Sequence, residues 1–258
     1  MDPMPSVWVI LRYDEMSPLP SKAHARAVPS KGLRFRMSSL RLGLLRPWPS
    51  SPEARALMAR YGRVSLAVRL EQQLRLRICP FEEVMRYVPQ SGRVLDLGCG
   101  FGALAQLLAA GSSKRYVVGI EQMAHRVAIA RQAAQSLPNV HFIQGDIHQV
   151  HFDLADCIVM NDVLHHVPHT LQIPLLKKCY ESLPSGGLLL IKDVNKSSVL
   201  KYIWNYLHDF LRNGNLPFYC LDTPVLLALL ELVGFRTTAV PLDAGYPYPH
   251  VLYICAKP

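Results

Sequence analysis

An acidic residue followed by regularly spaced glycines stands out in residues 94–102, which read VLDLGCGFG. The apolar run before Asp96 predicts a strand and residues 103–108 predict a helix, so the glycines lie in a tight loop between the two. Glycines in such a loop allow positive φ and let a ligand approach the backbone closely. We expect free N–H groups at the helix start to bind that ligand.

The spacing of these glycines separates two classes of cofactor site. A dinucleotide site requires Gly-x-Gly-x-x-Gly, whereas this chain has a glycine at every second position and an acidic residue two positions before the first. This form resembles the first motif of class I S-adenosylmethionine-dependent methyltransferases. The resemblance implies an S-adenosylmethionine site that contains Asp96, Gly98, Cys99, Gly100 and Gly102.

A second acidic residue follows at the end of another apolar run. Residues 116–120 predict a short strand that ends at Glu121, 19 residues after Gly102. An acidic side chain at the tip of the second strand can bind both ribose hydroxyls, and the resemblance implies this role for Glu121. Gln122 and Met123 would then lie beside the adenine.

Two later segments keep the order of the same family. Residues 140–143 predict a third strand, and the resemblance implies that Asp146 accepts from the adenine exocyclic amine, with Ile147 beside it. Residues 155–160 predict a fourth strand that leads to Asn161, a further cofactor residue. A turn or a solvated charge would explain any one of these motifs alone, but not the ordered set.

Two adjacent histidines, His165 and His166, follow the fourth predicted strand, where members of this family often carry a similar Leu-His-His. Methyl transfer from a sulfonium needs alignment of the acceptor and a dry pocket. A hydroxyl, amine or acidic carbon acceptor also benefits from a base with a pKa near neutrality. We expect His166 or His165 to be that base and favour His166; a cap or a core hydrogen bond is the alternative role. No set of metal ligands is readable, so no metal is predicted.

The alternation of strands and helices predicts an α/β fold with a doubly wound, mostly parallel sheet of seven strands. With N-terminal helices and a helical cap insertion, this is the Rossmann-like methyltransferase fold that the resemblance implies. Cofactors bind such sheets at the carboxyl ends of the strands, where every residue nominated above lies. The predicted strands are 93–97, 116–120, 140–143, 155–160, 187–193, 235–240 and 251–255, and the predicted helices are 102–110, 123–136, 170–183 and 223–233.

Composition divides the chain into three parts. Residues 1–49 are basic and rich in proline and serine, and we expect them to be disordered. Residues 50–90 predict N-terminal helices that form a lid, starting at a serine-proline-glutamate helix signal. Residues 91–258 form the predicted methyltransferase domain. Its insertion 195–222 is rich in aromatic side chains, which either shape an apolar substrate pocket or belong to the core.

Positive charge is concentrated at the front of the chain. Residues 1–77 hold 14 basic and 5 acidic side chains, a net charge of +9, whereas residues 78–258 are neutral overall. Such an excess indicates an anionic partner such as a membrane surface or a nucleic acid, or a solvated tail. No apolar run reaches the roughly 18–20 residues of a membrane span, and the six cysteines form no Cys-x-x-Cys pair. We expect a cytoplasmic protein with reduced thiols that associates with an anionic membrane through residues 1–77.

These observations predict a methyltransferase that uses S-adenosyl-L-methionine, releases S-adenosyl-L-homocysteine and methylates a small, hydrophobic or lipid-like acceptor. Methylation of O, N or C stays open, as do the oligomeric state and the place of residues 1–36, since Met37 is an alternative start. The alternative is a basic nucleic-acid-binding or RNA-modifying protein with this fold, which the intact acidic positions make a weaker reading. An Asn-Pro-Pro-Tyr motif for exocyclic amines is absent at 161–164, and the glycine spacing argues against a nicotinamide dehydrogenase.

Overall fold

The computed structural model describes residues 51–195, 219–242, 244, 246 and 248–258. All of them lie within Arg34–Pro258, one of two compact units into which the chain divides. The segment expected to be disordered, 1–49, and most of the expected cap insertion, 195–222, fall outside the described residues. The three-part division of the chain therefore stays a prediction.

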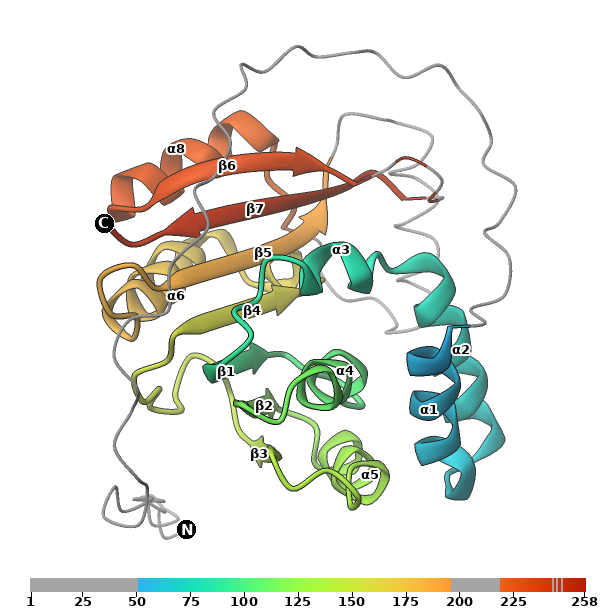
Figure 1. Ribbon diagram of the computed structural model, residues 1–258. Coiled ribbons are helices and arrows are strands. Elements are labelled where there is room, and N and C mark those ends of the chain that lie inside the picture. The colour runs from blue at the N-terminus through green and yellow to red at the C-terminus, as the bar shows by residue number, and fades with distance from the viewer. Residues whose placement is uncertain (1–50, 196–218, 243, 245, 247) are drawn as a thin grey trace, which may run out of the picture. The chain divides into compact units, whose positions relative to one another are not determined.

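Seven strands form one sheet in the order β3-β2-β1-β4-β5-β7-β6 (Figure 1). Strands β1 to β5 pair in parallel, and β7 runs antiparallel between β5 and β6. This topology confirms the predicted doubly wound, mostly parallel sheet. The strands are β1 Gly92–Leu97, β2 Arg115–Glu121, β3 Val140–Gln144, β4 Cys157–Asn161, β5 Leu188–Val194, β6 Arg236–Pro241 and β7 His250–Ala256.

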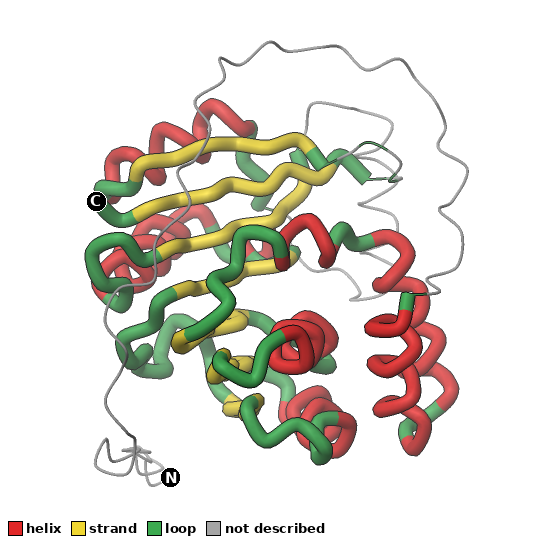
Figure 2. Tube along the Cα trace, viewed as in Figure 1, coloured by secondary structure: helices red, strands yellow, loops and turns green. Residues whose placement is uncertain are grey.

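Helices cover both faces of the sheet (Figure 2). Side chains alternate along β1, so Val94 is buried with α4 in one core cluster, while Leu95 is buried with α6 in the other. The first cluster also receives α1 to α3 and α5, and the second receives α8. The described helices are α1 Pro52–Arg60, η2 Tyr61–Arg63, α2 Leu66–Ile78, α3 Phe81–Met85, α4 Ala103–Gly111, α5 Ala124–Ala133, η3 Leu164–His166, α6 His169–Glu181 and α8 Thr223–Val233.

The N-terminal helices begin at serine caps and dock on the glycine loop. Ser51 Oγ accepts from Ala54 N at 3.1 Å and starts α1. The fully buried Tyr61 follows α1, and its hydroxyl donates to Phe101 O at 2.6 Å and accepts from Gln106 Nε2 at 2.9 Å. These two bonds fix the helical pair against the loop and helix that follow β1.

Candidate cofactor site and active site

The loop between β1 and α4 has positive φ at Gly98, Gly100 and Gly102, with values of 69°, 58° and 81°. A Cβ atom at Gly102 would lie 2.6 Å from the Phe142 ring, so glycine is required there for space as well as for conformation. The loop thereby keeps the close backbone approach that its glycines predict.

The N–H groups of this loop bond to the protein. Gly98 N and Cys99 N both donate to Ile120 O, at 2.8 and 3.0 Å, and Gly102 N donates to Cys99 O at 2.9 Å. The expectation that these particular groups await a ligand is therefore wrong, because the loop folds back onto the end of β2. What remains for a ligand is the loop's small profile and the side chains around it.

Glu121 ends β2 and bonds to two different loops. Its Oε2 accepts from Gly100 N at 3.0 Å, and its Oε1 accepts from Met123 N at 2.9 Å. The carboxylate is buried, with 7% of the residue exposed. Each oxygen retains a second lone pair, so Glu121 can still accept from the ribose hydroxyls predicted for it.

The residues predicted around the adenine lie beside Glu121 at the same edge of the sheet. Gln122 and Met123 are exposed before α5, and Met123 is its N-cap. Asp146 and Ile147 are half-buried after β3, which pairs with β2, and Asp146 Oδ1 accepts from the N–H of residue 148 at 2.9 Å. The structure brings these four residues together, and their contacts with adenine stay a prediction.

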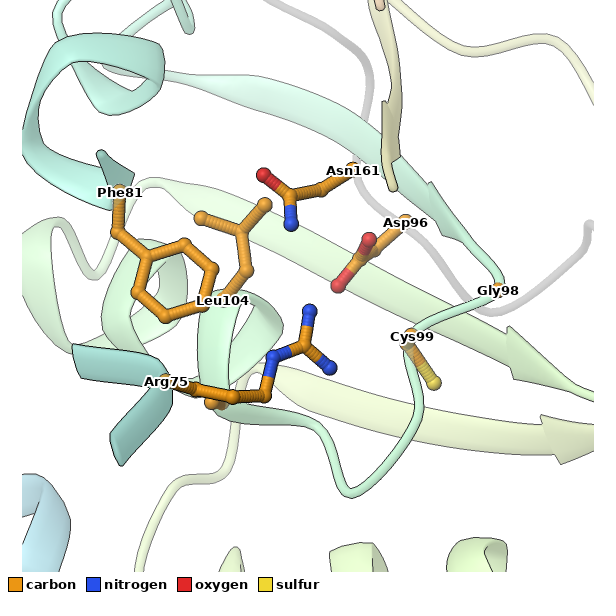
Figure 3. Close-up of a pocket in the computed structure, with 8 residues that line it drawn as sticks. Arg75, Phe81, Asp96, Gly98, Cys99, Leu104 and Asn161 are labelled. Carbon is orange, nitrogen blue, oxygen red and sulfur yellow. The ribbon is translucent and has the colours of Figure 1, made fainter. Parts of the chain in front are cut away.

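A small pocket opens at the carboxyl ends of β1 and β4 (Figure 3). Asp96 and Asn161, both predicted from the sequence, supply acidic and amide groups to it, and Phe81 and Leu104 supply apolar walls. Burial raises the pKa of Asp96 to about 7, although Arg75 and a backbone bond from Ala105 lower it in part. The lining residues are Arg75, Phe81, Asp96, Gly98, Cys99, Ala103, Leu104 and Asn161.

Arg75 of α2 is the pocket residue that sequence reasoning missed. Its side chain is 13% exposed, and its guanidinium points toward Asp96 and the glycine loop (Figure 3). The arginines of this region were interpreted as a charged outer face. A helical spacing that places Arg75 between the buried Gln72 and Cys79 could have identified it as inward-facing.

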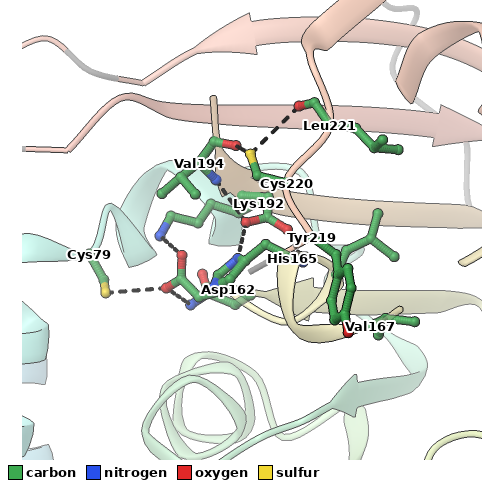
Figure 4. A network of polar contacts seen from close by, with 12 residues as sticks. Cys79, Asp162, His165, Val167, Lys192, Val194, Tyr219, Cys220 and Leu221 are labelled. Atoms are coloured by element: carbon green, nitrogen blue, oxygen red, sulfur yellow. Dashed lines mark hydrogen bonds and ion pairs between the residues drawn. The ribbon is translucent and has the colours of Figure 1, made fainter. Parts of the chain in front are cut away.

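Asp162, directly after β4, is the centre of a charged network (Figure 4). It has φ of 59°, and its Oδ1 accepts from the fully buried Lys192 Nζ at 2.5 Å. Its Oδ2 accepts from Asn161 Nδ2 at 3.0 Å and lies 3.8 Å from Arg75. Burial opposes ionisation of Asp162, but Lys192, His250 and Arg75 outweigh it and hold its pKa well below the usual range.

His165 pairs with Asp193 at the end of β5. His165 Nδ1 contacts Asp193 Oδ1, and Asp193 Oδ2 accepts from His165 N at 3.0 Å. Both residues are buried, and Val194 N fixes the carboxylate through a further bond of 2.8 Å. The half-buried His166 ring lies 4.0 Å from that of His165. This geometry favours His165 as the base, although the sequence favoured His166. Asp193 was missed, but an acidic residue at a strand end was a signal that could have found it.

Comparisons with known proteins agree with this geometry. A trans-aconitate 2-methyltransferase of Deinococcus radiodurans is 31% identical over 118 residues, which are 45% of this chain and 44% of that protein. The mitochondrial ubiquinone biosynthesis O-methyltransferase of Mus musculus is 31% identical over 119 residues, 43% of this chain and 31% of that protein. The chain spans about half the length of the curated relatives it matches, or less.

Solved structures show the fold, and a family model shows the domain. The pyocyanin biosynthetic protein PhzM superimposes with a TM-score of 0.62 at 18% identity, covering 78% of this chain and 62% of that one. The fold is thus that of the Rossmann-like methyltransferases. Residues 94–187 match the family model described as a methyltransferase domain. This part of the chain is a class I S-adenosylmethionine-dependent methyltransferase domain, and S-adenosylmethionine is its cofactor.

Proposed function

We propose that this protein transfers a methyl group from S-adenosylmethionine to a small acceptor, with His165 as the base. The observation that carries the proposal is the buried pair of His165 and Asp193, which lies at the same edge of the sheet as Asp96 and the glycine loop. A histidine held by a carboxylate beside a cofactor site is suited to take a proton from a nucleophile.

The roles of the residues follow from their contacts. S-adenosylmethionine, when bound, supplies a methyl group on a sulfonium that leaves as a neutral thioether. Glu121 and Asp96 orient the cofactor, while Phe81 and Leu104 keep water from the pocket. Asp193 receives the Nδ1–H of His165, which leaves Nε2 to accept the proton of the acceptor as its new bond to carbon forms.

A hydrophobic or lipid-like acceptor is the finer part of the proposal. Leu66, Leu70 and Leu74 lie one turn apart on α2 and are 66%, 53% and 41% exposed. The exposed Arg63 and Arg69 flank this leucine stripe. Apolar side chains bordered by arginines fit the interface of an anionic bilayer, where a lipid-like acceptor would be held. No helix among the described residues is long and apolar enough to cross a membrane.

Calorimetric titration with S-adenosylhomocysteine tests the proposal. We expect wild-type protein to bind it, and Asp96→Ala and Glu121→Ala to weaken the binding while the protein stays folded by circular dichroism. A binding-competent protein then justifies screening apolar hydroxyl, amine and acidic-carbon acceptors with a labelled methyl donor. Folded wild-type protein that does not bind S-adenosylhomocysteine would refute the proposed function.

A further inference from the structure

The pocket beside the glycine loop has an unusual combination of unsatisfied polar groups. Among the residues that the structure describes, Asp96 Oδ2, Asn161 Oδ1 and Arg75 Nε are buried and have no hydrogen-bond partner. All three residues line this one pocket. Buried polar atoms without partners are costly and uncommon in folded proteins, so their convergence indicates a ligand with both donors and acceptors.

The charge of Arg75 is only partly used within the protein. Asp162 already accepts short bonds from Lys192 and Asn161, and the Arg75 guanidinium lies 3.8 Å from it, beyond hydrogen-bond distance. The neighbouring Asp96 is held near half protonation at neutral pH by its burial. Positive charge therefore exceeds firmly ionised negative charge around this guanidinium, and an anion would balance it.

The position of the guanidinium is set by its neighbours. It lies over the Phe81 ring, 5.8 Å from the ring centroid. Its Nη1 would be 3.4 Å from a Cβ atom at Gly100, so it sits against the glycine loop at a point where that loop has no side chain. The acceptor atoms of Asp96 and Asn161 face it across the pocket (Figure 3).

We infer that Arg75 binds the carboxylate of the cofactor's methionine portion, while Asp96 and Asn161 accept from its ammonium group. An α-amino acid carries these opposite charges on one carbon, which matches the pairing of a guanidinium with two acceptors in a small pocket. The inference rests on the proposed function. It adds that α2, outside the matched residues 94–187, supplies part of the cofactor site.

A double-mutant cycle between Arg75 and the ligand carboxylate tests this. The ligands are S-adenosylhomocysteine and its analogue in which hydrogen replaces the carboxylate, with 5′-methylthioadenosine, which lacks the amino acid portion, as reference. The proteins are wild type, Arg75→Ala, Arg75→Lys and the control Arg69→Ala, which changes an exposed arginine on the same helix. Calorimetry gives each Kd, and thermal unfolding reports whether each variant is folded.

We expect Arg75→Ala to weaken S-adenosylhomocysteine binding about 10- to 100-fold, as for loss of a charge-assisted bond, and to change 5′-methylthioadenosine binding less than about twofold. Arg75→Lys should recover part of the loss, and Arg69→Ala should bind as wild type. Removing the ligand carboxylate should weaken wild-type binding by a similar factor and abolish the effect of Arg75→Ala.

Equal weakening of all three ligands by Arg75→Ala would show a structural role and overturn the inference. If no Arg75 variant folds, the comparison of the two homocysteine ligands on wild-type protein decides, and equal affinities overturn the inference. Wild-type protein that binds none of the ligands refutes the proposed function itself, whereas binding that ignores both Arg75 and the carboxylate refutes only the role of Arg75.

Discussion

The Glu121 carboxylate bonds to Gly100 N at 3.0 Å and to Met123 N at 2.9 Å, and so ties the glycine loop to the start of α5. The two loops belong to successive βα units, and the cofactor predicted for this domain would lie between them. Glu121 can therefore shape the site before a ligand arrives, in addition to any bond that it makes with the ribose.

Replacement of this carboxylate should weaken both binding and stability. In Glu121→Gln one oxygen acceptor becomes an NH2 group that faces a backbone N–H. We expect about a 10-fold loss of S-adenosylhomocysteine affinity by calorimetry and a melting temperature lower by several degrees. The control is Glu82→Gln, an exposed residue that should change neither value. Loss of affinity at an unchanged melting temperature would leave Glu121 a ligand contact but not a loop fastener.

Gly102→Ala and Gly186→Ala form a matched pair for the glycine loop. Their φ angles are 81° and 82°, so alanine suffers similar backbone strain at both, about 1 kcal/mol. A Cβ at Gly102 also meets Phe142 at 2.6 Å, whereas nothing lies within 4 Å at Gly186. Urea unfolding should give a loss of about 1 kcal/mol for Gly186→Ala and about 3 kcal/mol for Gly102→Ala. Equal losses would mean that the Phe142 contact relaxes without cost.

Asp96 should make unfolding depend on pH. Its pKa is about 7 in the folded protein, against 3.8 when it is unperturbed. Between about pH 4 and 7 the folded state retains a proton that the unfolded state has lost, so the free energy of unfolding from this group falls as pH rises. Asp96→Asn should remove that fall and unfold at higher urea than wild type at pH 7.5.

The same ionisation should control ligand binding in the opposite sense. The cofactor ammonium prefers the ionised Asp96, so S-adenosylhomocysteine affinity should rise between pH 5.5 and 7.5, and binding near pH 6 should release a proton. Calorimetry in buffers of different ionisation enthalpy measures the release. An affinity that rises equally in Asp96→Asn would assign the titration to another group.

Substitution of the two adjacent histidines should separate their roles. His165→Ala should lower kcat about 100-fold or more while S-adenosylhomocysteine binding is retained, because only the base is lost. His166→Ala serves as the neighbouring control and should keep most of the activity. Asp193→Asn should lower kcat and alter its pH profile, because the carboxylate no longer fixes the tautomer of His165. Greater dependence on His166 would return the base to the residue that the sequence favoured.

The leucine stripe of α2 predicts binding to anionic vesicles. Substitution of Leu66, Leu70 and Leu74 by Gln together should abolish flotation with vesicles that contain anionic phospholipid. A matched triple variant changes exposed leucines elsewhere, at Leu154, Leu171 and Leu232, and should still float. Wild-type protein that fails to float, or equal loss in both variants, would count against a membrane surface as the partner of α2.

The sheet and one side of the site could be predicted because their signals are local. The glycine loop after β1 and the acidic residues Asp96 and Glu121 each follow an apolar run, and the topology of a parallel sheet brings such ends together. The same rule reaches Asp193, which ends the apolar run of β5. These residues need no knowledge of long-range packing.

The other side of the site depends on how distant elements meet. Arg75 enters the pocket because α1 and α2 dock on α4 through Tyr61 and Gln106, a contact that no local pattern encodes. The choice between His165 and His166 depends on the turn η3, which directs only His165 toward β5. The fate of the loop N–H groups likewise depends on Ile120 of the neighbouring strand.

All six cysteines of the chain are free and buried, and burial raises the pKa of several of their thiols, including that of Cys179 to about 12. A thiol reagent therefore finds nothing to react with until part of the fold opens. Because Cys99 lies in the glycine loop and Cys157 in the central β4, they report on different regions. The rate at which each is labelled under native conditions is an intrinsic clock for local opening, readable without any added probe.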